Sequence, residues 1–184
     1  MTPSSNNIWN PARLDVRAFA LAGQSLQRVD ALGLFVRLSA EAVDGMGVDA
    51  HVQWHCNGEM RSDASGKSVP WVHLKAEVLV PLRCQRCLGP VDEMLEVDRW
   101  YRFVADEATA ELEDEDSEED VLALEPRPDI LQLVEDELLM ALPLVPMHDV
   151  CPVVLPMQAG NLGELGGEES PRENPFAQLA RLKK

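Results

Sequence analysis

The sequence lacks the features that would place the protein in a membrane or outside the cell. It contains no run of about 18 or more apolar residues, the length that a helix needs to span a bilayer. The N-terminus has neither the basic start nor the apolar core of a secretory signal peptide. We therefore expect a soluble, cytoplasmic protein without membrane contact. Its four cysteines should stay reduced and act as thiols, metal ligands or packing residues rather than in disulfides.

Recognisable catalytic motifs are also missing. The sequence has no nucleophile elbow, P-loop, dinucleotide-binding fingerprint or EF-hand loop. His51, His55 and His73 fall on the polar sides of expected strands, where a solvated or cross-strand role is more common than catalysis. Cys56, on an apolar side, is expected in the core, and Glu135–Glu137 are expected on a solvated helix face. These observations favour a protein that is not an enzyme.

Positive charge is absent from one long stretch of the chain. The segment from Asp106 to Asp120 contains ten acidic and no basic residues and accounts for most of the net charge of −16. Like charges repel and little of this segment can be buried, which predicts a disordered acidic loop over residues 105–121. A sharper alternative is a polyanion that mimics nucleic acid for a basic partner. In both cases a phosphate backbone would be repelled, so any RNA contact is expected to be indirect or weak.

Alternation of apolar and polar residues predicts three strands in the middle of the chain. They cover residues 48–56, 72–82 and 91–104, each with one apolar face. The segment between the first two, residues 57–68, is rich in turn-forming residues. Together they predict an antiparallel meander, barrel-like if it closes, packed with a few helices in an α+β fold. Pro81 cannot donate a ladder hydrogen bond and is expected on an edge or at a bulge.

Helical patterns flank these strands. Residues 10–22 and 32–43 are predicted as helices, with Asn10 as the N-cap of the first. The clearest helix follows Asp129, which is placed as its N-cap, and ends before Pro143.

The C-terminal part of the chain has a different composition. We expect one α+β domain over residues 1–156, followed by a flexible linker over 157–173 that is rich in glycine, glutamate and proline. Residues 174–184 form a short apolar stripe beside basic residues and predict a docking helix. Its candidate partner-binding residues are Asn174, Pro175, Phe176, Leu179 and Leu182.

Two cysteines with metal-ligand spacing lie in the connection between the second and third predicted strands. Cys84 and Cys87 are followed by Gly89, as in a zinc knuckle whose turn aims two thiolates inward. His148 and Cys151 follow the clearest helix, which can carry them back to the first pair and complete a structural zinc site. Two alternatives remain open. One is a thioredoxin-like redox pair, disfavoured because no helix begins at the motif, and the other is a set of thiols without metal.

Three motifs follow one another in a familiar order: "VPLRCQRCLGPV", then, after the acidic stretch, "DILQLVEDELLMALPLVPMHDVC", and finally "NPFAQLARLKK". In this combination the chain resembles the bacterial YceD family, the large ribosomal RNA subunit accumulation proteins. The resemblance implies a role in the synthesis, processing or stability of large-subunit (23S) ribosomal RNA. Cys84, Cys87 and His148 align with family positions, whereas Cys151 follows His148 more closely than in other members.

Charge and resemblance together favour a non-enzymatic ribosome biogenesis factor. Its expected partners are ribosomal proteins or assembly factors of the large subunit, whose basic surfaces would complement the acidic chain. The alternative from another class is a thiol- or zinc-dependent enzyme acting in RNA processing, which would need an activated thiol or an open zinc position. A third hypothesis is direct RNA binding through the basic C-terminal tip.

Overall fold

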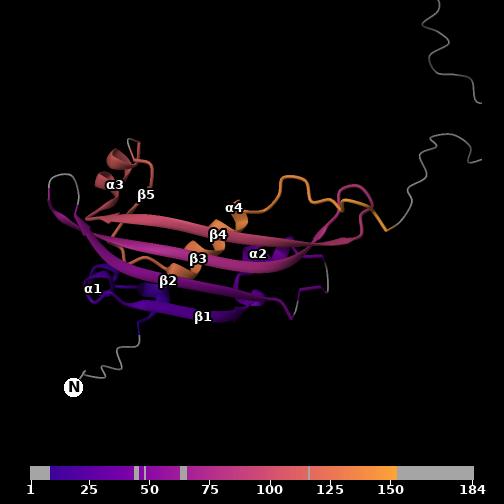
Figure 1. Cartoon of the computed structure of the whole chain (residues 1–184), viewed down its shortest axis with the longest axis horizontal. Helices are drawn as coiled ribbons and strands as arrows, with labels where there is room; N and C mark the ends of the chain where they lie inside the picture. The colour runs from indigo at the N-terminus through magenta and orange to yellow at the C-terminus, as the bar shows by residue number, and fades with distance from the viewer. Residues whose placement is uncertain (1–8, 44–45, 48, 63–65, 116, 153–184) are drawn as a thin grey trace, which may run out of the picture. The chain divides into compact units, whose positions relative to one another are not determined.

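The computed structural model describes residues 9–43, 46–47, 49–62, 66–115 and 117–152. Within them, five strands form one sheet, and their order in the sheet follows their order in the chain (Figure 1). The strands are β1 (Ser25–Ala31), β2 (His51–Ser62), β3 (Ser68–Arg83), β4 (Pro90–Val104) and β5 (Asp120–Ala123). The predicted linker and docking helix lie outside the described residues.

The sheet confirms the α+β class and the meander but differs from the prediction in three details. β1 to β4 pair antiparallel, whereas β5 pairs with β4 in parallel, so the sheet is mixed. β1 and β5 are its outer strands and do not pair with each other, so the sheet is open and not barrel-like. β1 itself was not predicted, because its sequence has no apolar alternation: its one buried residue is the charged Asp30.

β2 is longer than the sequence indicates. Its pairing with β3 continues to Ser62 opposite Ser68, so residues 57–62 belong to the strand and not to a turn. Gly58 reads as a turn residue, but here it lies against the ring of Phe19, which needs the space that a side chain would occupy. The glycine at this position therefore reflects close packing against the helix that carries Phe19.

Pro81 lies on an edge-like part of β3, as predicted. The pairing of β3 with β2 extends only to Glu77, while β4 still pairs with Pro81 through Asp92. The carbonyl of Pro81 accepts a hydrogen bond from the N–H of Val43 at 2.8 Å. No β2 residue pairs with Pro81, so the lack of an N–H on the proline costs no hydrogen bond to that strand.

One face of the sheet is covered by helices. α1 (Val16–Leu21) and α4 (Ile130–Met140) contact the strands, and α2 (Val36–Glu41) contacts α4. Figure 1 shows α4 crossing behind the middle strands. The largest fully buried side chains on this inner side include Trp54, Leu74, Tyr101, Phe103, Ile130 and Leu138. Full burial of each aliphatic side chain of this kind contributes about 1.5–3 kcal/mol, so this layer is the core.

The helix predicted after Asp129 is confirmed together with its cap. The carboxylate of Asp129 accepts hydrogen bonds from the N–H groups of Leu131 at 2.9 Å and Gln132 at 3.2 Å. The helix predicted over 32–43 is confirmed in part, as a 3₁₀ helix (Leu32–Leu34) followed by α2. None of the described helices combines the length and the apolar character needed to cross a membrane.

The N-terminal segment forms two short helices where one was predicted. Asn10 caps only the 3₁₀ helix Pro11–Arg13, and Asp15 caps α1. The break occurs at Leu14, which is extended and donates its N–H to the carbonyl of Pro128 at 3.0 Å. A long-range hydrogen bond that leaves no local signal thus interrupts the helix.

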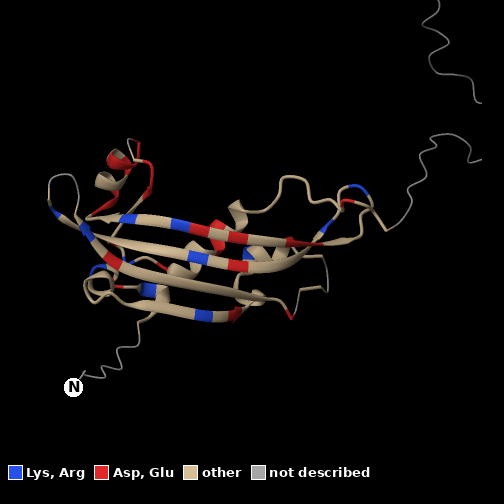
Figure 2. Cartoon of the chain, viewed as in Figure 1, with Lys and Arg blue, Asp and Glu red and all other residues tan. Residues whose placement is uncertain are grey.

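The acidic segment is folded over its described residues, so the prediction of a disordered loop over 105–121 is wrong for them. They include α3 (Glu107–Asp114), after which the chain enters β5. Asp106 is the N-cap of α3, since its carboxylate accepts the N–H of Thr109 at 2.9 Å. Acidic residues are concentrated along α3 and along the chain that leads to β5 (Figure 2).

A small local core holds this acidic segment in place. Arg102 of β4, with a side chain only 13% exposed, pairs with Glu113 and, at 2.9 Å, with Glu119. Beside it, Val104, Ala110 and Val121 form a separate apolar cluster. One largely buried cation and three small apolar side chains therefore order a segment whose composition alone indicates disorder.

We expect Gly58→Ala to lower the free energy of unfolding by about 1–3 kcal/mol, because the new Cβ would press on the Phe19 ring and lie 3.0 Å from Ala20 Cα. Urea denaturation followed by tryptophan fluorescence measures this. Gly33→Ala is the matched control, since nothing lies within 4 Å of its added Cβ. Equal midpoints for the two variants would contradict the packing described for Gly58.

Candidate metal centre

The turn between β3 and β4 brings Cys84 and Cys87 to one side of the chain. The N–H of Cys84 donates to the carbonyl of Gly89, and the N–H of Leu88 donates to the carbonyl of Cys84, both at 2.9 Å. Leu88, rather than Gly89, adopts a positive φ of 61°, a conformation uncommon for a residue with a side chain. The predicted strand-to-strand connection is confirmed.

The second half of the cluster arrives with the chain that follows α4. This chain runs from the end of α4 back to the turn between β3 and β4 (Figure 1). The N–H of Gln85 donates to the carbonyl of Pro146 at 2.9 Å, and the guanidinium of Arg86 donates to the carbonyl of His148 at 2.7 Å. Because these bonds use main-chain carbonyls, the side chains of His148 and Cys151 can approach the two cysteines.

All four predicted ligands meet at this point. The ligand atoms of Cys84, Cys87, His148 and Cys151 lie within 4.8 Å of one another. The Sγ atoms of Cys84 and Cys151 are 3.9 Å apart, and Sγ of Cys87 lies 3.5 Å from Nδ1 of His148. Around a tetrahedral zinc ion, two sulfurs lie roughly 3.8 Å apart, and a sulfur and a nitrogen roughly 3.6 Å apart. The four residues could therefore bind a metal ion of this kind.

The electrostatics of the cluster also suit a cation. Desolvation would raise the pKa of the Cys84 thiol, but N–H groups that include those of Cys87 and His148 outweigh it and lower the pKa to about 5. The N–H of Gly89 lowers the pKa of Cys87, yet burial and the thiols of Cys84 and Cys151 together raise it. Three thiols so close together cannot all ionise without a counter-charge, which a bound divalent cation would supply.

Arg86, between the two cysteines, is a functional residue that sequence reasoning missed. Its Nε donates to Sγ of Cys151 at 3.0 Å, and its guanidinium also donates to the carbonyl of Asp149 at 3.2 Å. The hydrogen bond to Cys151 is the main reason why the pKa of Arg86 is raised. The only sequence feature that marked Arg86 was its position inside the Cys-x-x-Cys motif. That position does not predict which groups its long side chain contacts.

The geometry disfavours a redox or catalytic reading of the cysteines. No helix begins at Cys84 or Cys87, because the chain turns directly into β4. Cys84, with the lowered pKa, is 0% exposed, so a substrate cannot reach its sulfur. Four protein ligands fill a tetrahedral coordination sphere, whereas catalytic zinc sites keep one position for water or substrate.

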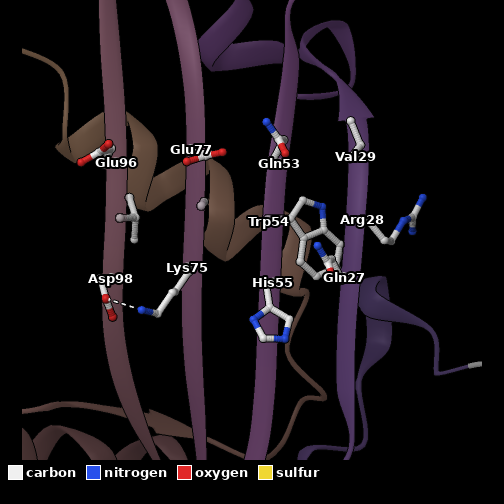
Figure 3. Close-up of a pocket in the computed structure, with 12 residues that line it drawn as sticks. Gln27, Arg28, Val29, Gln53, Trp54, His55, Lys75, Glu77, Glu96 and Asp98 are labelled. Carbon is white, nitrogen blue, oxygen red and sulfur yellow. Dashed lines mark ion pairs between the residues drawn. The ribbon is translucent and has the colours of Figure 1, made fainter.

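The histidines of the strands lie on the outer face of the sheet, away from the metal-ligand cluster. Nε2 of His73 contacts Oδ1 of Asp98 at 2.5 Å across β3 and β4, and Lys75 pairs with the same carboxylate at 2.8 Å. The contact with Lys75, then that with His73, lowers the pKa of Asp98. His55 lines a shallow cavity of about 490 Å³ on this face (Figure 3), and His51 is exposed. The predicted placement of the three histidines on the polar strand faces is thus confirmed, with a cross-strand contact for His73.

The acidic side chains of α4 are not the solvated face that was predicted. Arg37 of α2 donates to the carboxylate of Glu135 at 2.8 and 3.0 Å and to that of Asp136 at 2.6 Å. The side chains of Glu135 and Glu137 are each only 12% exposed. Glu135 and Asp136 therefore attach α2 to α4, whereas Glu137 pairs with Arg99 of β4 at 3.7 Å. Cys56, in contrast, is buried as predicted, and burial raises the pKa of its thiol to about 12.

The outer face also carries an aromatic cluster that sequence reasoning did not single out. The rings of Trp100 and His73 are stacked, with centroids 4.1 Å apart. The guanidinium of Arg61 lies 3.8 Å from the ring centroid of Trp100 and 4.6 Å from that of Trp71. In the alternation of side chains along β3 and β4, both tryptophans fall on the polar side. Their position there is the sequence feature that could have predicted an exposed aromatic cluster. Arg61 already occupies the space over both rings.

Comparison with known proteins agrees with the motifs. The family described as large ribosomal RNA subunit accumulation protein YceD matches residues 72–183, more than half of the chain, and this range includes all four ligand residues. A protein of Haemophilus influenzae with the same name is 38% identical over 109 residues, which span 59% of this chain and 63% of that protein. No solved structure matches. The chain therefore belongs to the YceD family of large ribosomal RNA subunit accumulation proteins.

Proposed function

We propose that this protein is a ribosome biogenesis factor that promotes the accumulation of large-subunit (23S) ribosomal RNA. The observation that carries the proposal is the family match, because the relative from Haemophilus influenzae is named for this role and the matched range includes the metal-ligand cluster. In this proposal the protein acts on the synthesis, processing or stability of the RNA, any of which changes its amount.

The proposed action is not catalytic. The best-formed cluster of reactive side chains has four protein ligands and a buried Cys84, as in structural zinc sites. In the outer-face cavity the carboxylate of Asp98 is already paired with Lys75. A thiol- or zinc-dependent enzyme acting in RNA processing remains the second candidate. It is supported by the low pKa of Cys84 and opposed by the burial of that sulfur.

Basic proteins are the proposed partners, either ribosomal proteins or assembly factors of the large subunit. The net charge of −16 is concentrated around α3 and β5 (Figure 2), and such a field speeds the encounter with lysine-rich surfaces. The same field repels phosphate, so contact with RNA is indirect or weak. The C-terminal residues 174–184 remain a candidate docking segment outside the described residues.

Zinc is the proposed metal, with a structural role. Purified wild-type protein should carry one zinc ion per chain, and Cys84→Ser and Cys151→Ser should each lose it, because three ligands hold zinc more weakly than four. Native mass spectrometry and elemental analysis measure the content. Cys56→Ala is the matched control, since this thiol is buried in the core and is not one of the four ligands. Zinc-free wild-type protein, or zinc retained in a Cys84→Ser/Cys151→Ser double variant, would contradict the assignment.

Deleting the gene in its own bacterium should lower the ratio of 23S to 16S ribosomal RNA, and a plasmid copy of the wild-type gene should restore it. Northern blots or RNA sequencing provide the measurement. A Cys84→Ser/Cys87→Ser variant that accumulates to the wild-type level and restores the ratio fully would remove the metal centre from the proposal. A wild-type copy that restores nothing would remove the proposal itself.

The acidic segment should contribute to partner binding through its charge. Converting four of its exposed glutamates to glutamine, at Glu107, Glu111, Glu115 and Glu118, should reduce the recovery of proteins extracted from purified large subunits by roughly severalfold at low salt. The matched control changes four exposed acids elsewhere to amides, at Glu41, Asp49, Glu77 and Glu96. Equal recovery with both variants, or tight binding of protein-free ribosomal RNA, would count against protein partners.

A further inference from the structure

The chain that returns from α4 to the metal centre exposes apolar side chains. Leu144 and Val150 are 101% and 85% exposed, and Val145 and Met147 are 53% and 49% exposed. Grouped apolar side chains of this kind are unusual on a monomer and mark interaction surfaces. None of the four belongs to the buried core, so the fold does not account for their apolar character.

This chain is positioned through its main chain and its two metal-ligand residues. The carbonyl of Pro146 accepts from Gln85, and the carbonyls of His148 and Asp149 accept from Arg86. The exposed apolar side chains are not among the groups that make these bonds. They are therefore held at defined positions while their surface stays available.

A shallow cleft of about 680 Å³ lies between this chain and the start of β4, and we call it the knuckle cleft. Its lining has five apolar side chains and three acidic ones. The apolar ones are Met46, Pro90, Val91, Met147 and Val150, and the acidic ones are Asp92, Glu93 and Asp149. No lysine or arginine is among the described residues that line it. The cleft thus offers apolar contact and negative charge together.

We propose that the knuckle cleft binds a segment of a partner protein in which apolar residues alternate with lysine or arginine. The apolar side chains would be buried against Met147 and Val150, and the cations would pair with Asp92, Glu93 and Asp149. RNA is a poor occupant because these carboxylates repel phosphate. A second copy that docked through the same cleft would bring the same carboxylates against themselves. The inference deepens the proposed function and rests on it for the basic character of the partner.

Metal binding and partner binding are coupled in this arrangement. His148 and Cys151 are ligand residues, and Met147 and Val150 are their immediate neighbours in the chain. Losing the ion would release one wall of the cleft, so the partner segment would bind the metal-free protein more weakly.

The test uses the zinc-loaded full-length protein and a fluorescein-labelled synthetic peptide that alternates leucine and lysine. Fluorescence anisotropy should show binding, and Met147→Ser/Val150→Ser should raise the Kd about tenfold or more. Leu21→Ser/Val36→Ser is the matched control, because these side chains are 68% and 71% exposed on other elements. The control should change the Kd by less than about twofold. Removing zinc with a chelator should weaken binding in the wild type.

Two further peptides separate the contribution of the apolar side chains from that of the cations. Replacing the leucines by serine, or the lysines by glutamate, should each abolish measurable binding. Equal Kd values for the cleft variant and the control variant would overturn the proposal, as would undiminished binding of the serine peptide. Sedimentation analysis covers the remaining occupant: a wild-type dimer that Met147→Ser/Val150→Ser converts to a monomer would assign the cleft to self-association and also overturn the proposal.

The failure of this inference is distinguishable from that of the proposed function. If only the cleft is misassigned, Met147→Ser/Val150→Ser restores the 23S to 16S ratio in deleted cells as fully as the wild type does. If the proposed function is wrong, the wild-type gene restores nothing, whatever the peptide binds. A correct assignment predicts wild-type rescue, reduced rescue by Met147→Ser/Val150→Ser and full rescue by Leu21→Ser/Val36→Ser.

Discussion

The packing of α4 against the inner face of the sheet is the contact on which the other features depend. Ile130, Val134 and Leu138 are all fully buried there, and Asp129 sets the residue at which the helix begins. Because the start and the buried face of α4 are both determined, the chain leaves it in a defined direction and reaches the turn between β3 and β4. Without α4 that turn would offer two thiols, which is half of what a tetrahedral metal ion requires.

Features with a periodic or local signal could be predicted from the sequence. This group contains the alternation of buried and exposed residues along β3 and β4, the helix cap at Asp129 and the four metal-ligand residues. Features set by distant residues could not. Gly58 is typical of a turn by its sequence, but its lack of a side chain makes room for the ring of Phe19. β1 has no apolar alternation that would predict a strand. The acidic segment has the composition of a disordered loop but is ordered by its ion pairs with Arg102. In each case the deciding partner lies well outside the local sequence window.

Three arginines of this acidic chain connect separate parts of the fold. Arg37 attaches α2 to α4, Arg102 neutralises two glutamates of the acidic segment, and Arg86 links the two halves of the metal-ligand cluster. Each of these arginines meets more than one acceptor, as its forked guanidinium allows. Other cations, such as Lys75 and Arg99, have side chains that are more than half exposed, so the surface carries both signs.

The separation of the ligands along the chain has a consequence for the order of events during synthesis. Cys84 and Cys151 are 67 positions apart, and the loop between them contains β4, α3, β5 and α4. An ion bound to both would act as a cross-link, and closing a loop of this length in the unfolded chain corresponds to about 4 kcal/mol of stabilisation. It could form only after Cys151 had left the ribosomal exit tunnel. Metal binding by all four ligands would then require that the chain had been completed to this point.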